Sequence, residues 1–373
     1  MPLISLEIRN VRVYEHAQIH PDPNLNLIIG ANASGKTSLL EAIHLLGTGR
    51  SYRTSDFEQI QKQNTLGLSV QGALTIGLDA QTDSTEVSFS RSSEGRRITI
   101  NGLAQAQVSA IAQLLPLQVI SPDTHYEFRG SSRHRRSVLD WVLFHVEPEF
   151  QEIWSRYQRI LQQRNAGLKA STQTRTRHVW DESLAVLGED IHSRRMHVLA
   201  CLKADFMACC HDLLGADQEV DLVLESGWEQ NKNLSQCLVD DAGRDGVRGF
   251  THSGPHRADL SINLNHLGKP IDASHGQYKL LVMALRLAQI RFFAESKNKR
   301  CCLLIDDLAA ELDTEHRARM VQLLSSLPIQ LFVTATDSAS IDIHDWPTHK
   351  AFHVEQGSIK EGAQTRIYRA VGP

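Results

Sequence analysis

The amino-acid sequence predicts a two-lobed α/β protein, in which both ends of the chain form one lobe and a helical lobe is inserted between them. Two apolar runs, at 25–29 and 301–305, have the length and composition of buried strands and lie far apart in the chain. The first is followed by a glycine-rich loop and the second by two aspartates. Between them, residues 131–214 carry apolar side chains at spacings of three and four, which favours helices.

The first part of the α/β lobe follows from short apolar patterns. We expect an opening strand at 3–8, and a helix over 37–46 after the glycine-rich loop. Short alternating runs between about 65 and 101 predict an antiparallel meander. Asn101-Gly102 is the dipeptide that tight hairpin turns prefer, so we place a turn there.

The second part of the α/β lobe is expected near the end of the chain. A long helix is predicted from Gln277 to about Glu295. The runs at 301–305 and 329–335 are apolar throughout, which is typical of parallel strands covered on both faces. We therefore divide the chain into an N-terminal part of the α/β lobe (1–121), a helical lobe (122–248) and a C-terminal part of the α/β lobe (249–373).

Composition narrows the classes of function. The chain has 39 Lys and Arg against 43 Asp and Glu, a net charge of −4, so a nucleic-acid surface would have to be a local patch. Six cysteines show no C-x-x-C spacing, which favours reduced, buried thiols over disulfides or zinc ligands. Apolar runs fall short of a membrane span and no signal peptide is expected, so we predict a cytoplasmic protein that does not bind membranes.

The glycine-rich loop matches the phosphate-binding pattern G-x-x-x-x-G-K-[ST]. The expected ATP-binding residues are Gly30, Ala31, Asn32, Ala33, Ser34, Gly35, Lys36 and Thr37. The loop stands between a strand and a helix, where its backbone N–H groups can surround phosphates and Lys36 can reach the terminal ones. Thr37 is then expected to ligate Mg²⁺.

Asp306 and Asp307 follow an apolar strand, as expected for the second half of a phosphate-loop site. We expect Asp306 to hold Mg²⁺, directly or through water, and Asp307 to act catalytically by polarising the attacking water. Lys36, at the terminal phosphates, is the second residue expected to be catalytic. The alternative is a strand followed by a solvated acidic turn.

Ser274, His275, Gly276 and Gln277 open the long helix that precedes this strand. A hydroxyl, exposed backbone N–H groups and the positive end of a helix dipole all suit a phosphate. The alternative is an ordinary helix N-cap by Ser274. The position between the two halves of the phosphate site favours the phosphate role.

This order of motifs resembles the ABC-type ATPase head of the structural-maintenance-of-chromosomes (SMC) proteins, and more narrowly the RecF family. The matching segments are IRNVRVYE (8–15), GTGRSYRT (47–54), VISPD (119–123), RRSVLDW (135–141), GPHRAD (254–259), HGQYKLLVMALRLAQ (275–289) and LLIDDLAAELD (303–313). The resemblance implies an ABC/SMC-like fold with a mixed sheet, an antiparallel meander and a parallel core. Asp337 stands where ABC transporters have a switch histidine, so no histidine is given a catalytic role.

The resemblance also implies how such a protein works. The signature Ser274–Gln277 of one subunit would cap the ATP held by a second copy, and Asp313 would lie in the adjoining D-loop. ATP-dependent dimers would then bind duplex, gapped or single-stranded DNA without sequence specificity. Slow, DNA-stimulated hydrolysis of ATP would reset the clamp, and RecR and RecO would be the partners in loading a recombinase during recombinational repair and the SOS response.

Clustered basic residues are the candidate DNA contacts. One cluster, between 153 and 180, contains no acidic residue, and the other two lie around 133 and 96. The expected contacts are Arg133, Arg135, Arg136, Arg156, Arg159 and Arg164. Each cluster has a simpler interpretation as a solvated face, and Arg135 or Arg136 has the alternative of pairing with Asp140.

Two other functions fit part of the sequence. The phosphate loop and the signature also occur in energy-coupling ATPase subunits of membrane transporters, which co-purification with membranes would reveal. A small-molecule kinase would use the same phosphate loop but needs no signature, and it would transfer phosphate to a metabolite without any effect of DNA.

Overall fold

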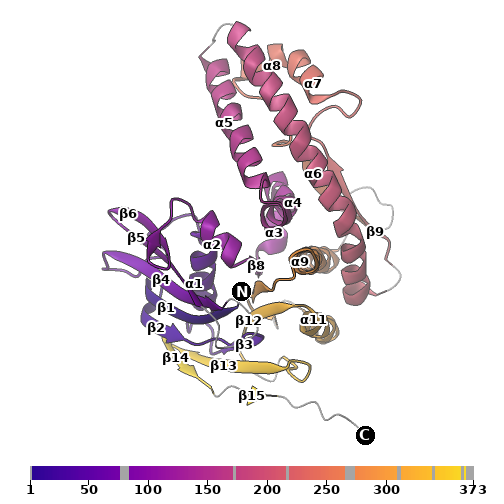
Figure 1. Ribbon diagram of the computed structural model, residues 1–373. Helices are drawn as coiled ribbons and strands as arrows, with labels where there is room; N and C mark the ends of the chain where they lie inside the picture. The colour runs from indigo at the N-terminus through magenta and orange to yellow at the C-terminus, as the bar shows by residue number, and fades with distance from the viewer. Residues whose placement is uncertain are drawn as a thin grey trace. The chain divides into compact units, whose positions relative to one another are not determined.

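The computed structural model describes residues 2–75, 84–170, 174–215, 218–264, 274–308, 312–337, 341–362 and 365–366. The chain forms two compact units (Figure 1). The first contains Met1–Thr124 and Lys297–Pro373, and the second contains His125–Ser296. Both chain ends therefore contribute to one unit, as the sequence predicts.

An antiparallel sheet forms one layer of the first unit. Its strands run in the order β2 (Tyr14–Ile19), β1 (Leu3–Val11), β4 (Gly67–Thr75), β5 (Ser84–Ser92), β6 (Gly95–Ile100) and β7 (Leu103–Ala104). Ile8, Val70 and Phe89 lie side by side in register and are buried, so this face belongs to the core. The predicted turn at Asn101-Gly102 joins β6 to β7, and both residues have positive φ.

A mostly parallel sheet forms the second layer. Its order is β14 (Ser358–Glu361), β13 (Thr348–Glu355), β3 (Leu25–Ile29), β12 (Ile329–Ala335), β11 (Cys301–Ile305) and β8 (Leu117–Ile120), with β15 (Thr365–Arg366) beside β13. Every residue of β3, β11 and β12 is buried, which explains their unbroken apolar sequence. Because these strands are parallel, the loops that follow β3 and β11 lie at the same edge of the sheet.

Helix α1 (Lys36–Thr48) packs into the core between the two sheets. Its Leu39 and Ile43 belong to one buried cluster with Ile8 of the antiparallel sheet and Leu304 of the parallel sheet. The helices α2 (Ser109–Leu114) and α11 (Thr314–Ser326) complete the described helices of this unit. The start of α1 is thereby held at the edge where β3 ends.

The second unit is mainly helical. Its helices are α3 (Thr124–Gly130), α4 (Ser132–Val146), α5 (Phe150–Lys169), α6 (Thr174–Leu214), α7 (Leu234–Asp240), α8 (Ala242–Arg248) and α9 (His275–Lys297). A hairpin of β9 (Val220–Glu225) and β10 (Asp259–Leu264) completes it. Helix α5 runs beside the N-terminal part of α6, and α6 continues beyond it (Figure 1).

The second unit extends further along the chain than the helical lobe expected from the sequence at 122–248. The hairpin and α9 pack with the helices, through the Arg135–Asp259 ion pair and a bond from the Gln289 amide to the Val138 carbonyl oxygen at 2.7 Å. The turn-rich composition after residue 222 suggested a return to the other lobe, but these long-range contacts decide the unit to which the segment belongs. None of the helices that the structure describes is long and apolar enough to span a membrane.

Candidate nucleotide-binding site

The loop after β3 has the close backbone packing that its glycines permit. A Cβ atom at Gly30 would lie 2.3 Å from the Val354 carbonyl oxygen, so no larger residue fits. Gly35 has a φ of 120° and Ala33 a φ of 63°. Gly35 also accepts a hydrogen bond at its carbonyl from the Tyr14 hydroxyl, at 2.9 Å. The sequence thus folds into a rigid, concave loop at the start of α1.

Lys36 reaches back across this loop. Its Nζ donates to the carbonyl oxygens of Gly30 and Ala31, at 2.7 and 2.8 Å. Burial lowers the pKa of Lys36, while Asp307 and Asp306 act in the opposite direction. The Lys36 partners are neutral, so a phosphate oxygen can replace them with a gain in charge attraction. No side chain of the described residues caps α1, whose first N–H groups suit an anion.

Thr37 and Asp306 meet although 269 residues separate them. The Thr37 hydroxyl donates to Asp306 Oδ1 at 3.0 Å, and Thr334 donates to the same oxygen at 2.9 Å. Burial raises the pKa of Asp306, and the bonds from Thr334 and Thr37 oppose that rise. A hydroxyl beside a carboxylate is the oxygen donor set that Mg²⁺ prefers, so Thr37 and Asp306 fit this ion.

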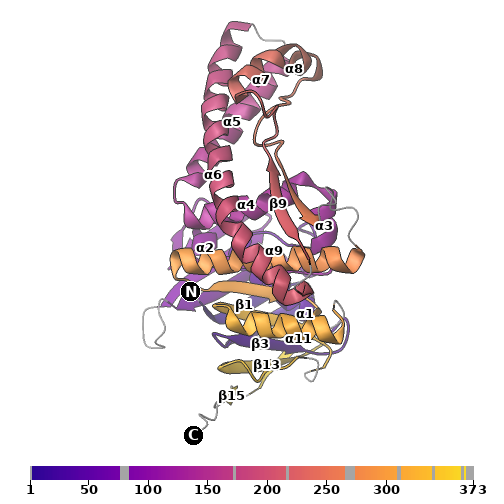
Figure 2. The ribbon, with the colours of Figure 1, turned by 90° about the vertical axis from the view of Figure 1, so that its right-hand side faces the viewer.

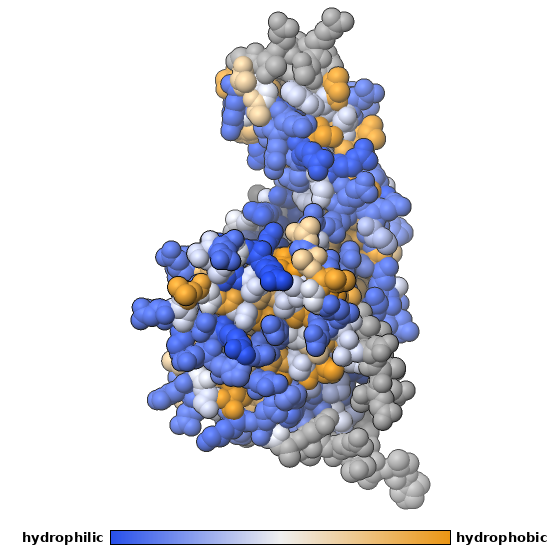
Figure 3. Space-filling model, turned by 60° about the vertical axis from the view of Figure 1, so that its left-hand side comes forward, coloured by the Kyte–Doolittle hydropathy of each residue, from blue (hydrophilic) through white to orange (hydrophobic). Residues whose placement is uncertain are grey.

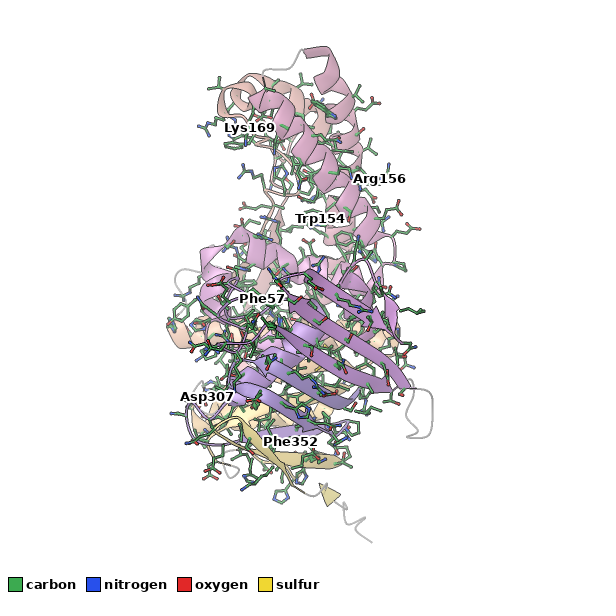
Figure 4. All side chains as sticks on the ribbon, turned by 90° about the vertical axis from the view of Figure 1, so that its left-hand side faces the viewer. Phe57, Trp154, Arg156, Lys169, Asp307 and Phe352 are labelled. Carbon is green, nitrogen blue, oxygen red and sulfur yellow. The ribbon has the colours of Figure 1, made fainter. Side chains whose placement is uncertain are left out.

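Asp307, labelled in Figure 4, follows Asp306 directly and has a strained backbone conformation. Its φ is 55°, which is uncommon for a residue other than glycine, and its N–H donates to the Thr334 hydroxyl at 2.7 Å. Strain of this kind persists only where the surrounding structure maintains it, and it occurs often at functional sites. The two carboxylates are therefore held differently, one by hydroxyl donors and the other through its backbone.

A buried carboxylate, Glu41, organises the segment that follows α1, and sequence reasoning missed it. Arg12 donates from Nε and Nη2 to both Glu41 oxygens, at 2.7 and 2.8 Å, and Ser51 donates to one of them. Arg53 lies 3.7 Å from the same carboxylate. Arg12 and Ser51 belong to IRNVRVYE and GTGRSYRT, but spacing in the sequence does not reveal that these segments meet at Glu41.

Tyr52 is a second residue that the sequence did not single out. Its hydroxyl lies 3.4 Å from Asp306 Oδ2, within reach of a long hydrogen bond. Burial raises the pKa of Tyr52 well above its usual value, and Asp306 and Glu41 add to that rise. Tyr52 therefore stays protonated and is a donor toward the candidate Mg²⁺ ligand.

The signature Ser274–Gln277 begins α9 in the second unit. Ser274 Oγ accepts the Gln277 N–H at 3.2 Å, and the Gln277 side chain accepts the Ser274 N–H at 3.1 Å, a reciprocal cap. Ser274, His275 and Gly276 are exposed. The capping alternative is thus realised, but it leaves the hydroxyl proton of Ser274 for another acceptor. His275 Nε2 lies 3.3 Å from His125 Nε2.

Asp313 caps α11 in the first unit. Its carboxylate accepts the His316 N–H at 2.9 Å and also contacts the His316 ring, and these bonds lower the pKa of Asp313. Residues 309–311, between Asp313 and the two aspartates, lie outside the described residues, as does Ala273 before the signature.

Three of the six arginines predicted to contact DNA are bound within the second unit: Arg164 is buried, and Arg135 and Arg136 are partly buried. Arg164 is 1% exposed and pairs with Asp181 at 2.6 Å and Asp245 at 2.7 Å. Arg135 donates to both Asp259 oxygens, and Arg136 donates to the Ala258 carbonyl. Arg164 is removed from the candidate contacts because it balances two carboxylates in the interior. Arg135 and Arg136 are not proposed as contacts, because each donates to the segment 258–259. Asp140, offered as a partner for Arg135 or Arg136, pairs with Arg195 at 2.8 Å.

The other three predicted contacts are exposed. Arg133 lies on α4, and Arg156 and Arg159 lie one turn apart on α5 (Figure 4). No ion pair to these three is found among the described residues. Lys169, at the end of α5, is exposed as well, while the side chains of Arg175 and Arg177 lie outside the described residues.

The comparisons agree with the fold and the site. The family model for the RecF/RecN/SMC N terminal domain matches residues 2–360. An α/β unit with a phosphate loop after β3, an aspartate pair after β11 and a second, helical unit defines a nucleotide-binding head of this class. The DNA replication and repair protein RecF of Vibrio atlanticus is 37% identical over 97% of this chain and 100% of its own length. RecF of Pseudomonas entomophila is 35% identical over 97% and 98%. The chain belongs to the RecF family.

Solved structures share the fold over nearly the full length. The recombination mediator protein RecF with ATP has a TM-score of 0.84 and 24% identity, covering 97% of this chain and 98% of that one. An Smc head bound to the C-winged helix domain of ScpA has a TM-score of 0.61 and 16% identity, covering 98% of each chain. The predicted ABC/SMC-like α/β fold with a helical insert is confirmed.

Proposed function

We propose that this chain is a DNA replication and repair protein that acts as an ATP-dependent clamp. The observation that carries the proposal is the contact between Thr37 of the phosphate loop and Asp306, two halves of one site from opposite ends of the chain. Membership of the RecF family and the solved RecF–ATP structure support ATP as the ligand. The same membership favours DNA repair over a transporter subunit or a small-molecule kinase.

Each residue of the site then has a separate task. Lys36 exchanges its two carbonyl partners for phosphate oxygens, and the backbone N–H groups of the loop surround the remaining phosphates. Thr37 and Asp306 hold Mg²⁺, which supplies charge neutralisation at the phosphates. Asp307 orients and polarises the attacking water. Tyr52 donates to Asp306 Oδ2, the carboxylate oxygen that Thr37 and Thr334 do not bind, and keeps that oxygen in position.

ATP is held between two copies of the chain in this proposal. The exposed Ser274 hydroxyl and the first N–H groups of α9 provide a phosphate contact to the ATP of a second copy. Dimerisation then depends on ATP, and slow hydrolysis at Asp307 releases the dimer. Asp313, exposed at the start of α11, lies at the same subunit boundary.

Exposed arginines support DNA as the partner of the dimer. Arg133, Arg156 and Arg159 present free guanidinium groups in the second unit. The first unit has a hollow of 530 Å³ on the antiparallel sheet, lined among others by Arg91, Arg96 and Arg97. On the face in Figure 3, hydrophilic residues predominate. Such contacts bind phosphates without reading bases, so duplex or gapped DNA is bound regardless of sequence, with RecR and RecO as protein partners.

Sedimentation of the purified protein tests this function. We expect a monomer alone, a dimer with ATP and Mg²⁺, and a dimer that carries a gapped duplex at 50 mM but not at 200 mM salt. Six to ten neutralised phosphates predict a fall in DNA affinity of about 10³ to 10⁵ over that range. A protein that stays monomeric with ATP and binds no DNA contradicts the clamp.

A further inference from the structure

A cavity of 620 Å³ lies in the second unit, between α6 and the loop that follows β9. The residues lining it include Glu189, His192, Met196, Leu224, Trp228 and Lys232. Its volume is in the range of pockets that hold a small molecule or an anchoring side chain. None of these residues has a task in the ATP site or among the proposed DNA contacts, so the cavity requires its own explanation.

The aromatic side chains of His192 and Trp228 form one wall of the cavity. His192 Nδ1 is buried, and no hydrogen-bond partner for it is found within the described part of the chain. The His192 ring packs edge-on against Trp228, with 5.0 Å between the ring centroids. Burial and the nearby Arg195 lower the pKa of His192, so the ring is neutral at neutral pH. The accessible lining beside His192 is therefore the Trp228 indole with Met196 and Leu224, which suits an apolar side chain.

The cavity opens onto an exposed, weakly polar face of α6. Met196 at its edge is 44% exposed, and Met207, three turns further along the helix, is 54% exposed. Ala200 and Ala204 lie between them and are also exposed. The run from Met196 to Met207 is about 16 Å long, and α6 continues beside β9 in this region (Figure 2). Exposed methionines are common on surfaces that adapt to a partner.

The charges around the cavity are mainly negative. Lys232 is paired with Glu229 at 2.9 Å and with Asp240 at 2.8 Å, so its charge is already neutralised. Glu189 adds a further carboxylate, whose Oε1 accepts the Leu234 N–H at 2.9 Å. Three carboxylates and one ammonium group repel DNA phosphates and attract basic groups.

We infer that this cavity and the adjoining face of α6 form a docking surface for a basic segment of a partner protein. An apolar side chain of that segment enters the cavity beside Met196 and Trp228. Lys or Arg residues on either side face Glu189, Glu229 and Asp240. The inference goes beyond the ATP and DNA roles proposed above and does not require them.

Methyl NMR of the full-length chain labelled at methionine tests this surface. The sequence has five methionines, of which Met196 and Met207 report on the surface while the buried Met283 and Met320 serve as internal references. The probes are purified RecR, purified RecO and a synthetic amphipathic peptide of Lys and Leu, with a counterpart in which Glu replaces Lys. The two proteins are chosen from the proposed function, whereas the peptide is chosen only for its chemistry.

We expect at least one basic probe to shift the Met196 and Met207 signals while Met283 and Met320 stay unchanged, and the Glu peptide to have no effect. Met196→Lys should weaken that binding about tenfold or more, because it places a positive charge at the mouth of the cavity, which repels a basic segment. Val247→Lys is the matched control, since Val247 is 89% exposed on α8 of the same unit.

Three outcomes would overturn the inference. If none of the basic probes shifts the Met196 signal at millimolar concentration, the surface does not bind a basic partner. Equal losses from Met196→Lys and Val247→Lys make the binding a general effect of charge. If the Met196 and Met207 signals change with the concentration of the protein when no probe is present, the surface binds a second copy of the chain. ATP affinity measured on the same samples shows whether each variant is folded and keeps this test separate from that of the clamp.

Discussion

Lys36 in the phosphate loop and Arg164 on α5 are both buried cations that the sequence marked as phosphate contacts, yet their partners differ in kind. Lys36 donates to two carbonyl oxygens within six residues of itself, and these are neutral. Arg164 donates to two carboxylates from Asp181 and Asp245, far away in the sequence. A buried cation with neutral, local partners can exchange them for a ligand, whereas one that balances buried carboxylates is part of the structure.

Replacing Arg164 should have the largest effect. Arg164→Ala leaves Asp181 and Asp245 without their partner in the interior, and losing one member of a buried ion pair typically costs about 3–5 kcal/mol of unfolding free energy. Urea denaturation followed by helix content measures this cost. Arg159→Ala, on the exposed side of the same helix, is the control and should change stability by less than about 0.5 kcal/mol. A stable Arg164→Ala protein that has lost only DNA affinity would reverse the comparison.

Replacing Lys36 should act on the ligand rather than on the fold. Lys36→Ala removes the only cation that donates to the described phosphate-loop carbonyls, so ATP affinity should fall about 100-fold, or roughly 2.7 kcal/mol. Calorimetric titration with ATP and Mg²⁺ measures this change. Lys169→Ala, an exposed lysine of the second unit, should bind ATP normally. ATP affinity that survives Lys36→Ala would contradict the assignment of the loop.

Replacing Asp307 should separate binding from hydrolysis. Asparagine has the same shape and tolerates the positive φ of Asp307, so Asp307→Asn should keep the local backbone intact. ATP binding should persist, and the ATP-bound dimer should dissociate about tenfold more slowly because hydrolysis is lost. Size-exclusion chromatography after removal of free ATP follows the dimer. Glu94→Gln, at an exposed position of the same unit, is the control. Dimers that dissociate faster than those of the unchanged chain would refute the role of Asp307.

Replacing the exposed arginines of α5 should have the smallest effect on the molecule itself. Arg156→Gln and Arg159→Gln should each reduce the slope of log affinity for duplex DNA against log salt by about 0.9 per subunit, which is about 1.8 for the dimer. Stability should stay within about 0.5 kcal/mol. Fluorescence anisotropy at several salt concentrations measures the slope. Arg244→Gln removes an exposed arginine that is already paired with Asp241 and should leave the slope unchanged. Equal slopes in all variants would place the DNA elsewhere.

Local sequence patterns were sufficient to predict much of the secondary structure of the first unit. The strands at 301–305 and 329–335 and the helix after the phosphate loop match β11, β12 and α1 closely. These elements could be predicted because an unbroken apolar run, or a glycine at a required backbone angle, carries its structural meaning within a few residues. The strand β13, which lies beside β3, was not predicted, because its mixed sequence of intermediate burial lacks such a pattern.

The sequence by itself determined the phosphate loop, the aspartate pair, the signature and the family, because each is a short motif whose order along the chain is visible. The two motifs also predicted that Thr37 and Asp306 would meet, as they do. Only the tertiary structure decided that Glu41 pairs with Arg12 and Ser51, and that Arg164 is buried. The physical reason is that the role of a charged side chain depends on the group with which it pairs, and these partners lie tens of residues away in the sequence. The composition gives the number of charged residues, but only the folded structure shows which of them form ion pairs.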